Sequence, residues 1–414
     1  MGQGRVSAAR SVRARCRALL GLAAGLWAGS SAAQDEPASL TAAPVELHAF
    51  VSQGFILSAK NEYLATSRRG SLEFSEVGLN LTKPLPENLR LGVQLFAHDL
   101  GPFGNFAPQF DWYYLDWRPR DEFGIRVGRL KMPFGLYNEL NDIDAARVPI
   151  LLPQSIYQAD HREYLFALAG GELYGDVHLG DAGSLEYRGY GGTLPGQLPS
   201  GPQQPGVSVV RAAVPYVYGA RLLWSTPLDG LVAGYSGQAV RFDVDYALDP
   251  AVRAVLEGAT ILPPGLVNPL AVKFRVTRWI ASLQYVAHDL DFSAEYSRWT
   301  GVFYSPAPAL FPRHTVNERY YAMASYHLSS WFTPGVYYSA YFPNVKDRGG
   351  RESHQKDLAV TTRYDLTDHW LIKLEGHLMF GTATLDNKQL NGGVEQKNLA
   401  PTWGVLLVKT TAYF

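Results

Sequence analysis

This chain has almost none of the features that identify a disulfide-stapled domain, a thiol enzyme or a helical membrane protein. Its 414 residues include a single cysteine, Cys16, close to the amino terminus. The remainder of the chain therefore has no disulfide and no cysteine-based metal site or nucleophile. No apolar run after Gln34 reaches the roughly 20 residues that a transmembrane helix requires. Mean hydropathy is −0.10, so a membrane, if the chain crosses one, has to be crossed by strands.

An excess of charge of either sign is also missing. Lysine and arginine total 37 against 38 acids, which gives a formal net charge of −1. Removal of the five arginines found in the first 33 residues would leave −1 − 5 = −6. A mildly acidic chain without a basic stretch lacks the electrostatic footprint of a nucleic-acid-binding protein.

The amino terminus predicts export. Arginines precede the apolar run Ala18–Trp27, and the small residues at 31–33 follow it. This order indicates a signal peptide over residues 1–33, with Gln34 as the first mature residue. Because Cys16 lies ahead of the apolar run, it is in the wrong place for a lipid anchor. An arginine-rich, acid-free start is also found in organelle transit peptides, and that alternative stays open.

Two kinds of break divide the rest of the chain. From residue 46 onward, segments of about ten residues or more alternate apolar and polar side chains, the period of a strand with two different faces. The short breaks, rich in turn-forming residues, lie at 83–88, 118–121, 180–183, 227–230, 288–291, 329–334 and 365–368. The long breaks lie near 59–69, 100–108, 133–162, 193–213, 246–270, 304–316, 344–355 and 384–397.

Seven short breaks interleaved with eight long ones separate sixteen strands. We therefore predict an all-β fold, a 16-stranded antiparallel transmembrane β-barrel over residues 46–414, preceded by a short periplasmic linker at 34–45. Its short turns would face the periplasm and its long loops the exterior. A large soluble β-sandwich has a similar composition, but it has no reason to segregate short and long connections.

The two faces of the predicted strands differ in the way that a membrane barrel requires. In 172–179 and in 370–378, apolar residues alternate with charged or polar ones. Charge on one face of successive strands requires water on that side, because an unpaired buried ion is costly. Aromatic residues near strand ends, such as those at 112–117, suit the girdles where lipid meets water. A general preference of aromatic residues for strands is the alternative explanation.

One connection is far longer than strands usually need. Pro133 and Gly135 end the strand that precedes it, and the loop runs to about residue 162. We predict that this loop folds into the barrel and constricts a pore, its acids facing bases on the wall. The loop candidates are Asp142, Asp144, Arg147, Asp160 and Arg162, and the wall candidates are Arg126, Arg129, Lys131, Arg188, Arg221, Arg363 and Lys373. Alternatively, the loop charges are solvated outside, or they pair and pin the loop.

Three stretches resemble known bacterial outer-membrane proteins. The final strand, 403–414, ends in Phe414 and resembles the signal that barrel-insertion machinery reads. Residues 128–135 (GRLKMPFG) and the first strand, 47–55, resemble the trimeric outer-membrane porins, especially the phosphate-selective (O/P-type) porins and related 16-stranded porins. The sequence departs from a dedicated anion porin in showing no clear ladder of inward arginines and lysines.

The resemblance implies a function and a location. A porin of this kind is a homotrimer in the bacterial outer membrane, in contact with its lipid and lipopolysaccharide. It lets small hydrophilic or anionic solutes diffuse passively through a pore that its mid-chain loop narrows. No cofactor, metal or enzymatic activity is expected of it.

Other classes of barrel have sequence signatures of their own. Gly234-Tyr235-Ser236-Gly237 has the wrong spacing for a nucleophile elbow, and no His-Glu-x-x-His motif is present. A His-Asp or His-Ser pair across the lumen stays open as an enzyme site, since triads are made by geometry rather than by order in the chain. An adhesive or structural barrel also stays open. About a dozen residues between Gln34 and the first strand leave no room for the plug domain of an energy-driven receptor.

Two segments fit this scheme poorly. In 273–280 the apolar and charged parities exchange partway, which predicts a bulge or a strand that continues above the membrane. The loop 248–270 carries apolar residues to which the pattern assigns no place.

Overall fold

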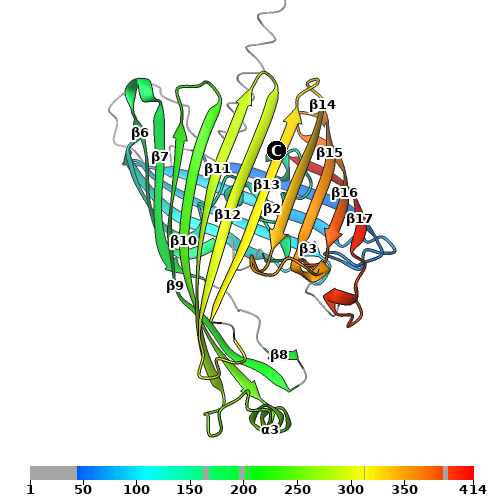
Figure 1. Ribbon diagram of the computed structural model, residues 1–414. Helices are drawn as coiled ribbons and strands as arrows, with labels where there is room; N and C mark the ends of the chain where they lie inside the picture. Colours follow the sequence, from blue (N-terminus) through cyan, green and yellow to red (C-terminus); the bar gives the residue numbers. More distant parts are fainter. Residues whose placement is uncertain (1–43, 162–166, 195–200, 205, 312, 386–389) are drawn as a thin grey trace, which may run out of the picture.

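The computed structural model describes residues 44–161, 167–194, 201–204, 206–311, 313–385 and 390–414. The predicted signal peptide, nearly all of the predicted linker, and Arg162 lie outside these residues. All the described strands belong to one antiparallel sheet (Figure 1). The sheet is closed, because β1 pairs with β2 on one side and with the last strand, β17, on the other.

The strands are β1 (Glu46–Ala59), β2 (Phe74–Leu85), β3 (Leu89–Leu100), β4 (Gln109–Arg120), β5 (Phe123–Lys131), β6 (Ala167–His178), β7 (Ser184–Thr193), β8 (Gly201–Gln204), β9 (Val207–Ser225), β10 (Leu231–Leu248), β11 (Leu270–Ala287), β12 (Leu290–Tyr304), β13 (His314–Tyr326), β14 (Phe332–Phe342), β15 (Gln355–Thr367), β16 (Trp370–Gly381) and β17 (Thr402–Tyr413). β8 has four residues and pairs only with β9, while β7 continues the barrel by pairing directly with β9. The other sixteen strands form the closed barrel, so the predicted fold class is confirmed.

The connections also follow the prediction. β2 and β3, β4 and β5, and each later pair at that end of the barrel are joined by short turns, and all the long loops lie at the other end. A turn of two to five residues suits an antiparallel pair, and the short-turn end of an outer-membrane barrel is the periplasmic one. We call the long-loop end the outer end.

Three strands continue beyond the rest of the barrel. β9, β10 and β11 have 19, 18 and 18 residues, and with β8 and α3 (Pro250–Gly258) they form a lobe at the bottom of Figure 1. Pro250 at the first helical turn after Asp249 suits the start of this helix. Leu248, Leu262 and Leu270 pack together in the lobe, which gives the unplaced apolar residues of the loop a small core of their own.

The register of β11 settles the parity exchange. β11 pairs with β10 from Leu270 to Tyr285 without a shift, so of the two options the strand that continues past the barrel is correct. The adjacent β9–β10 pair, by contrast, has register shifts beside Arg241 and Asp245.

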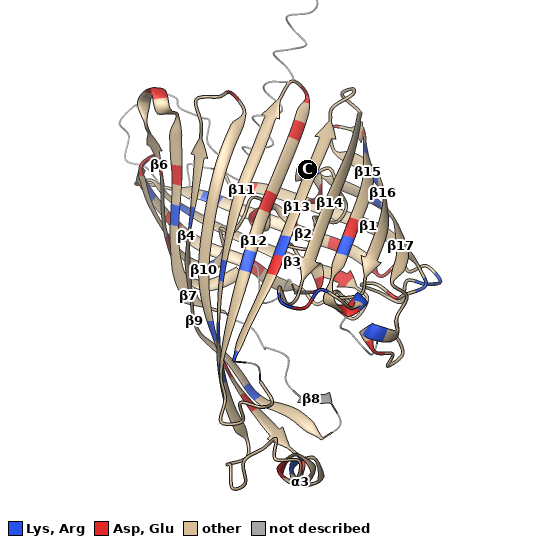
Figure 2. Ribbon diagram, in the orientation of Figure 1, with Lys and Arg blue, Asp and Glu red and all other residues tan. Residues whose placement is uncertain are grey.

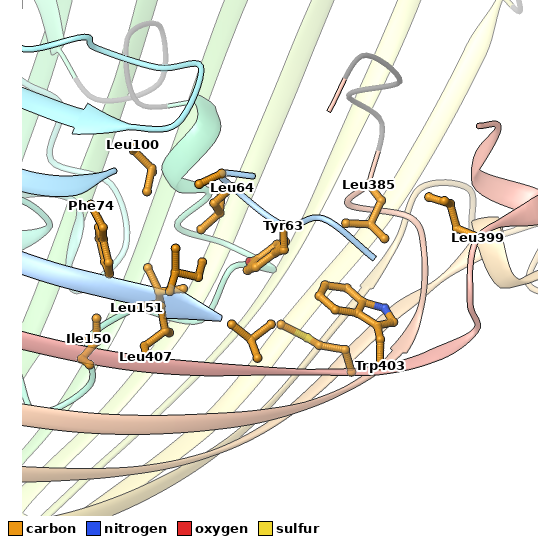
Figure 3. Packing of buried hydrophobic residues seen from close by; sticks show 14 residues of the cluster. Tyr63, Leu64, Phe74, Leu100, Ile150, Leu151, Leu385, Leu399, Trp403 and Leu407 are labelled. Carbon is orange, nitrogen blue, oxygen red and sulfur yellow. The ribbon is translucent and has the colours of Figure 1, made fainter. Parts of the chain in front are cut away.

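The outer face of the barrel is apolar. Exposed valine, leucine and aromatic side chains occupy many of the outward positions, as Leu374, Leu378 and Phe380 do on β16. The interior holds several separate apolar clusters rather than one core. Figure 3 shows the largest of them, in which Tyr63, Ile150 and Trp403 come from two loops and the wall. Among the described residues, no helix is long and apolar enough to span a bilayer.

Candidate pore constriction

The loop between β5 and β6 lies inside the barrel, as predicted from its length. Within it, Phe134 is 1% exposed, and Leu152 and Ile156 are fully buried. These side chains pack against Ile280 of β11 and Tyr321 of β13. Three short 3-10 turns, η1 (Asn138–Leu140), η2 (Asp144–Ala146) and η3 (Ala159–His161), shape its path. We refer to residues 132–161 as the inner loop.

The carboxylate of Glu295 on β12 anchors one side of the inner loop. It accepts hydrogen bonds from the Leu136 backbone N–H at 2.9 Å and from the Tyr157 hydroxyl. The hydroxyls of Tyr321 and Ser282 donate to the same carboxylate from the neighbouring strands. A buried carboxylate without a cation is stable only when such donors surround it.

A second anchor lies on β15 to β17. Lys373 Nζ donates to the Asp144 carbonyl at 2.6 Å and to Asp144 Oδ1 at 3.0 Å. Thr411 donates to Asp144 Oδ2 at 2.8 Å, and Lys409 Nζ lies 3.7 Å from Asp144 Oδ1. Burial alone would raise the pKa of the Asp144 carboxyl, but Lys373, Lys409 and Arg147 outweigh it and hold the pKa well below its usual range. Asp144 is therefore ionised, and it ties the inner loop to β16 and β17.

Two neighbouring groups extend this second anchor. Arg363 on β15 donates to the carbonyl of Ala145 at 2.6 Å. The carboxylate of Glu375 on β16 accepts the backbone N–H groups of Ile150 and Leu151, at 2.6 and 2.9 Å. The His377 ring, bonded to Asp357 at 3.0 Å, lies 3.0 Å from that same carboxylate and holds it in place.

The third anchor joins the inner loop to β7 and β9. The Glu139 carboxylate lies 2.7 Å from Arg188 and 3.0 Å from Arg221. Arg188 also binds Glu172 at 2.6 Å, and Glu172 binds Arg126 at 3.2 Å. Burial would raise the pKa of Glu139, but the two arginines dominate and lower it to about 2.

The inner loop begins with a further set of charges. Lys131 at the end of β5 is bonded to Asp142 and lies 3.4 Å from Asp111 of β4. Arg129 donates to the Asp111 carbonyl at 2.9 Å. These contacts fix the point at which the chain leaves the wall.

The structure thus brings the predicted loop and wall charges together. They form direct ion pairs and hydrogen bonds, whereas the prediction had acids and bases facing each other across the pore. Asp142, Asp144 and Arg147 are buried in the inner loop, and five of the seven wall bases contact this loop directly. This is the pinning arrangement that was weighed as the alternative. Asp160 lies in η3, and Arg162 lies outside the described residues. Phe414 pairs through its backbone with Ala49, and its side chain is 63% exposed.

The sequence did not reveal several cations of the inner wall. Together with those predicted, they place cations on β3, β5, β7, β9, β11, β13 and β15 to β17. The residues missed are Arg90 on β3, Arg278 on β11, Arg319 on β13 and Lys409 on β17. The ladder that the sequence lacked is therefore present, and most of its members are neutralised by acids. Figure 2 shows blue and red segments interspersed on the barrel wall.

Arg278 and Arg319 differ from the other wall cations. Neither forms an ion pair with a carboxylate of the described residues. The Arg278 guanidinium is buried, none of its nitrogens has a described hydrogen-bond partner, and it lies 3.4 Å from the ring centre of Phe134. Arg319 lies 3.8 Å from the ring centre of Trp299 and donates to Gln158 at 2.7 Å. Both guanidinium groups thus lie on aromatic rings beside the inner loop instead of binding a carboxylate directly.

Comparison with solved structures supports the fold. OmpT of Vibrio cholerae aligns with a TM-score of 0.58 at 8% identity, over 92% of this chain and all of that one. An anion-selective porin from Comamonas acidovorans aligns with a TM-score of 0.54 at 13% identity, over 90% of this chain and all of that one. The chain has the fold of an outer-membrane β-barrel.

A third neighbour is the outer membrane channel DcaP of Acinetobacter baumannii, with a TM-score of 0.51 at 12% identity, over 91% of this chain and 99% of that one. At these identities the likeness shows the fold of the barrel and not its solute. No protein-family model and no curated protein matches the sequence.

Proposed function

We propose that this barrel is a bacterial outer-membrane porin, exported by its signal peptide, through which small hydrophilic solutes diffuse passively. The observation that carries the proposal is the inner wall, where charged side chains gather around a loop that folds into the lumen. A wide barrel with a polar interior is the architecture of a diffusion channel. Neighbours described as a porin and as a channel support this proposal.

We further propose a homotrimer that favours anions, consistent with the porin family that the sequence resembles. The preference would come from Arg278 and Arg319, wall cations that lie on aromatic rings and bind no described carboxylate directly. Cations at a constriction that no carboxylate binds directly attract anions and repel cations. The O/P-type assignment and the role of Phe414 in barrel insertion are part of the same proposal.

Planar-bilayer recording with the purified protein tests the channel. Ohmic steps that group in threes are expected from a trimer of independent pores. Absence of current in a range of electrolytes, from protein that circular dichroism shows to be folded, would contradict the proposal.

The selectivity prediction concerns Arg278→Gln and Arg319→Gln. Each substitution is expected to lower the anion-to-cation permeability ratio about fivefold, the equivalent of losing about 1 kcal/mol of attraction in a hydrated pore. The measurement is the reversal potential across a salt gradient. Arg275→Gln is the matched control, because Arg275 lies on the same strand but is exposed. Equal ratios in all three variants would remove the anion assignment and leave the channel intact.

A barrel enzyme is the alternative function. Among the described residues, His377 bonds two carboxylates and His327 lies 3.1 Å from the hydroxyl of Thr333. A hydrolase triad needs a hydroxyl bonded to a histidine that is in turn bonded to an acid, and neither arrangement has this chain of hydrogen bonds. This geometry favours the porin.

A further inference from the structure

A groove of about 750 Å³ lies on the wall formed by β1 and β15–β17. It lies on the apolar side of these strands, since Leu57, Leu358 and Leu406 line it and are 37–47% exposed. Its strands are near the outer end there, because β1 ends and β17 begins at that end. The groove therefore opens toward the outer leaflet of the bilayer.

Two glycines form the floor of the groove. Gly376 is paired between Val360 and Leu406, and Gly404 between Leu378 and Ala59. A Cβ at Gly376 would meet no atom within 4 Å, and one at Gly404 would meet only the His377 carbonyl, at 3.4 Å. Neither glycine has a positive φ. The chain itself does not need glycine at these positions, where glycine weakens a strand.

Two cations close the outer end of the groove. Lys60 and Arg68 line it, and both are exposed. Among the described residues, Lys60 Nζ donates only to the Thr402 carbonyl, at 3.1 Å. The backbone N–H of Arg68, rather than its guanidinium, donates to the Glu62 carboxylate. No described carboxylate forms an ion pair with either side chain. An apolar groove that ends in two cations without an ion pair is complementary to an acyl chain that ends in an anionic head group.

We propose that this groove binds lipopolysaccharide, with an acyl chain over Gly376 and Gly404 and a phosphate at Lys60 and Arg68. The position at the outer end selects a lipid of the outer leaflet, and the two cations select a phosphorylated head group. The proposal rests on the outer-membrane location in the proposed function, but not on conduction. It gives the two glycines a role, because they make room for the lipid.

The test uses the folded protein in detergent, titrated with purified lipopolysaccharide and observed by native mass spectrometry. Gly376→Leu and Gly404→Val are expected to weaken binding about tenfold, the equivalent of about two methylene groups kept from burial. Lys60→Ala and Arg68→Ala are each expected to weaken it about fivefold. A double variant, Lys60→Ala with Arg68→Ala, lacks both cations. Dephosphorylated lipopolysaccharide is expected to bind the unchanged protein with the same weak affinity that intact lipopolysaccharide has for this double variant.

Matched controls separate this effect from a general one. Gly189→Leu fills an equally open glycine position on β7, away from the groove, and Lys346→Ala removes an exposed cation of another loop. Both controls are expected to bind lipopolysaccharide as the unchanged protein does. Conductance is expected to be the same in all variants, so failure of the lipid site and failure of the channel give different results.

Two results would overturn the proposal. One is unchanged affinity in both glycine variants and in the variant without Lys60 and Arg68, with circular dichroism showing folded barrels. The other is a shift from oligomer to monomer in light scattering for Gly376→Leu with lipid still bound. That second result would assign the groove to a contact between copies of the chain.

Discussion

Asp144→Ala is expected to lower the free energy of unfolding by about 3–5 kcal/mol, because it leaves buried cations without their shared carboxylate. Lys373 and Lys409 are both 0% exposed, and both direct Nζ toward Asp144 Oδ1. Lys409 keeps Glu76 as a partner, whereas Lys373 keeps only backbone carbonyls. The measurement is the urea midpoint of the detergent-folded protein, followed by tryptophan fluorescence.

The same variant can also be measured by planar-bilayer recording. Loss of the η2 anchor is expected to raise open-channel current noise, because the inner loop gains freedom on that side. Glu395→Ala is the control, since its pair with Lys397 has side chains that are 51% and 62% exposed and should contribute about 0–1 kcal/mol. If Asp144→Ala is no more destabilising than this control, Asp144 does not stabilise the attachment of the inner loop to the wall. Combining it with Lys373→Met should restore much of the stability, because the uncompensated charge is then gone.

Arg188→Met is the second large effect that we expect. Arg188 joins Glu139 of the inner loop to Glu172 of the wall, and its loss leaves two buried carboxylates with one arginine each. A loss of about 3–5 kcal/mol in unfolding free energy is expected from a broken buried pair. Arg118→Met serves as control, because the acids that it pairs with are 51% and 67% exposed. Equal urea midpoints in the two variants would contradict the third anchor.

The pH dependence of stability tests the same anchor. Glu139 has a pKa of about 2 in the folded chain, below its value in the unfolded chain. A lowered pKa gives stability that is complete above the unfolded value and is lost as pH falls through the folded one. The unchanged protein should therefore lose stability from about pH 5 to about pH 2. Glu139→Gln should show a shallower decline over that range, and an identical decline would exclude Glu139 as a source.

The sequence predicted the barrel because the alternation of its strands and the lengths of its loops are local properties. It also predicted the inner loop, since charge and proline mark residues 133–162 within a single stretch. α3 was missed, although Asp249 before Pro250 is a helix-start signal and Val252 and Leu256 have helical spacing. A short helix inside an irregular loop has too few turns for its period to stand out.

The partners of the inner loop could not be predicted. Glu375 caps Ile150 across 225 residues of chain, and Arg278 lies in the segment where the strand parity exchanges. Parity tells which face a residue occupies but not its height, and only the strand registers bring Arg188, Arg221 and Glu139 to one level. For the same reason, facing charges were expected where direct pairs are found.

The positions of the three anchors have a consequence for the order of assembly. The inner loop is complete by residue 161, but its binding partners on β15 to β17 lie between residues 363 and 411. During membrane insertion the second anchor can be completed only once β15 to β17 have joined the sheet. Contacts so distant in sequence form slowly. A nascent barrel that lacks β17 would therefore hold the inner loop with fewer contacts than the finished one.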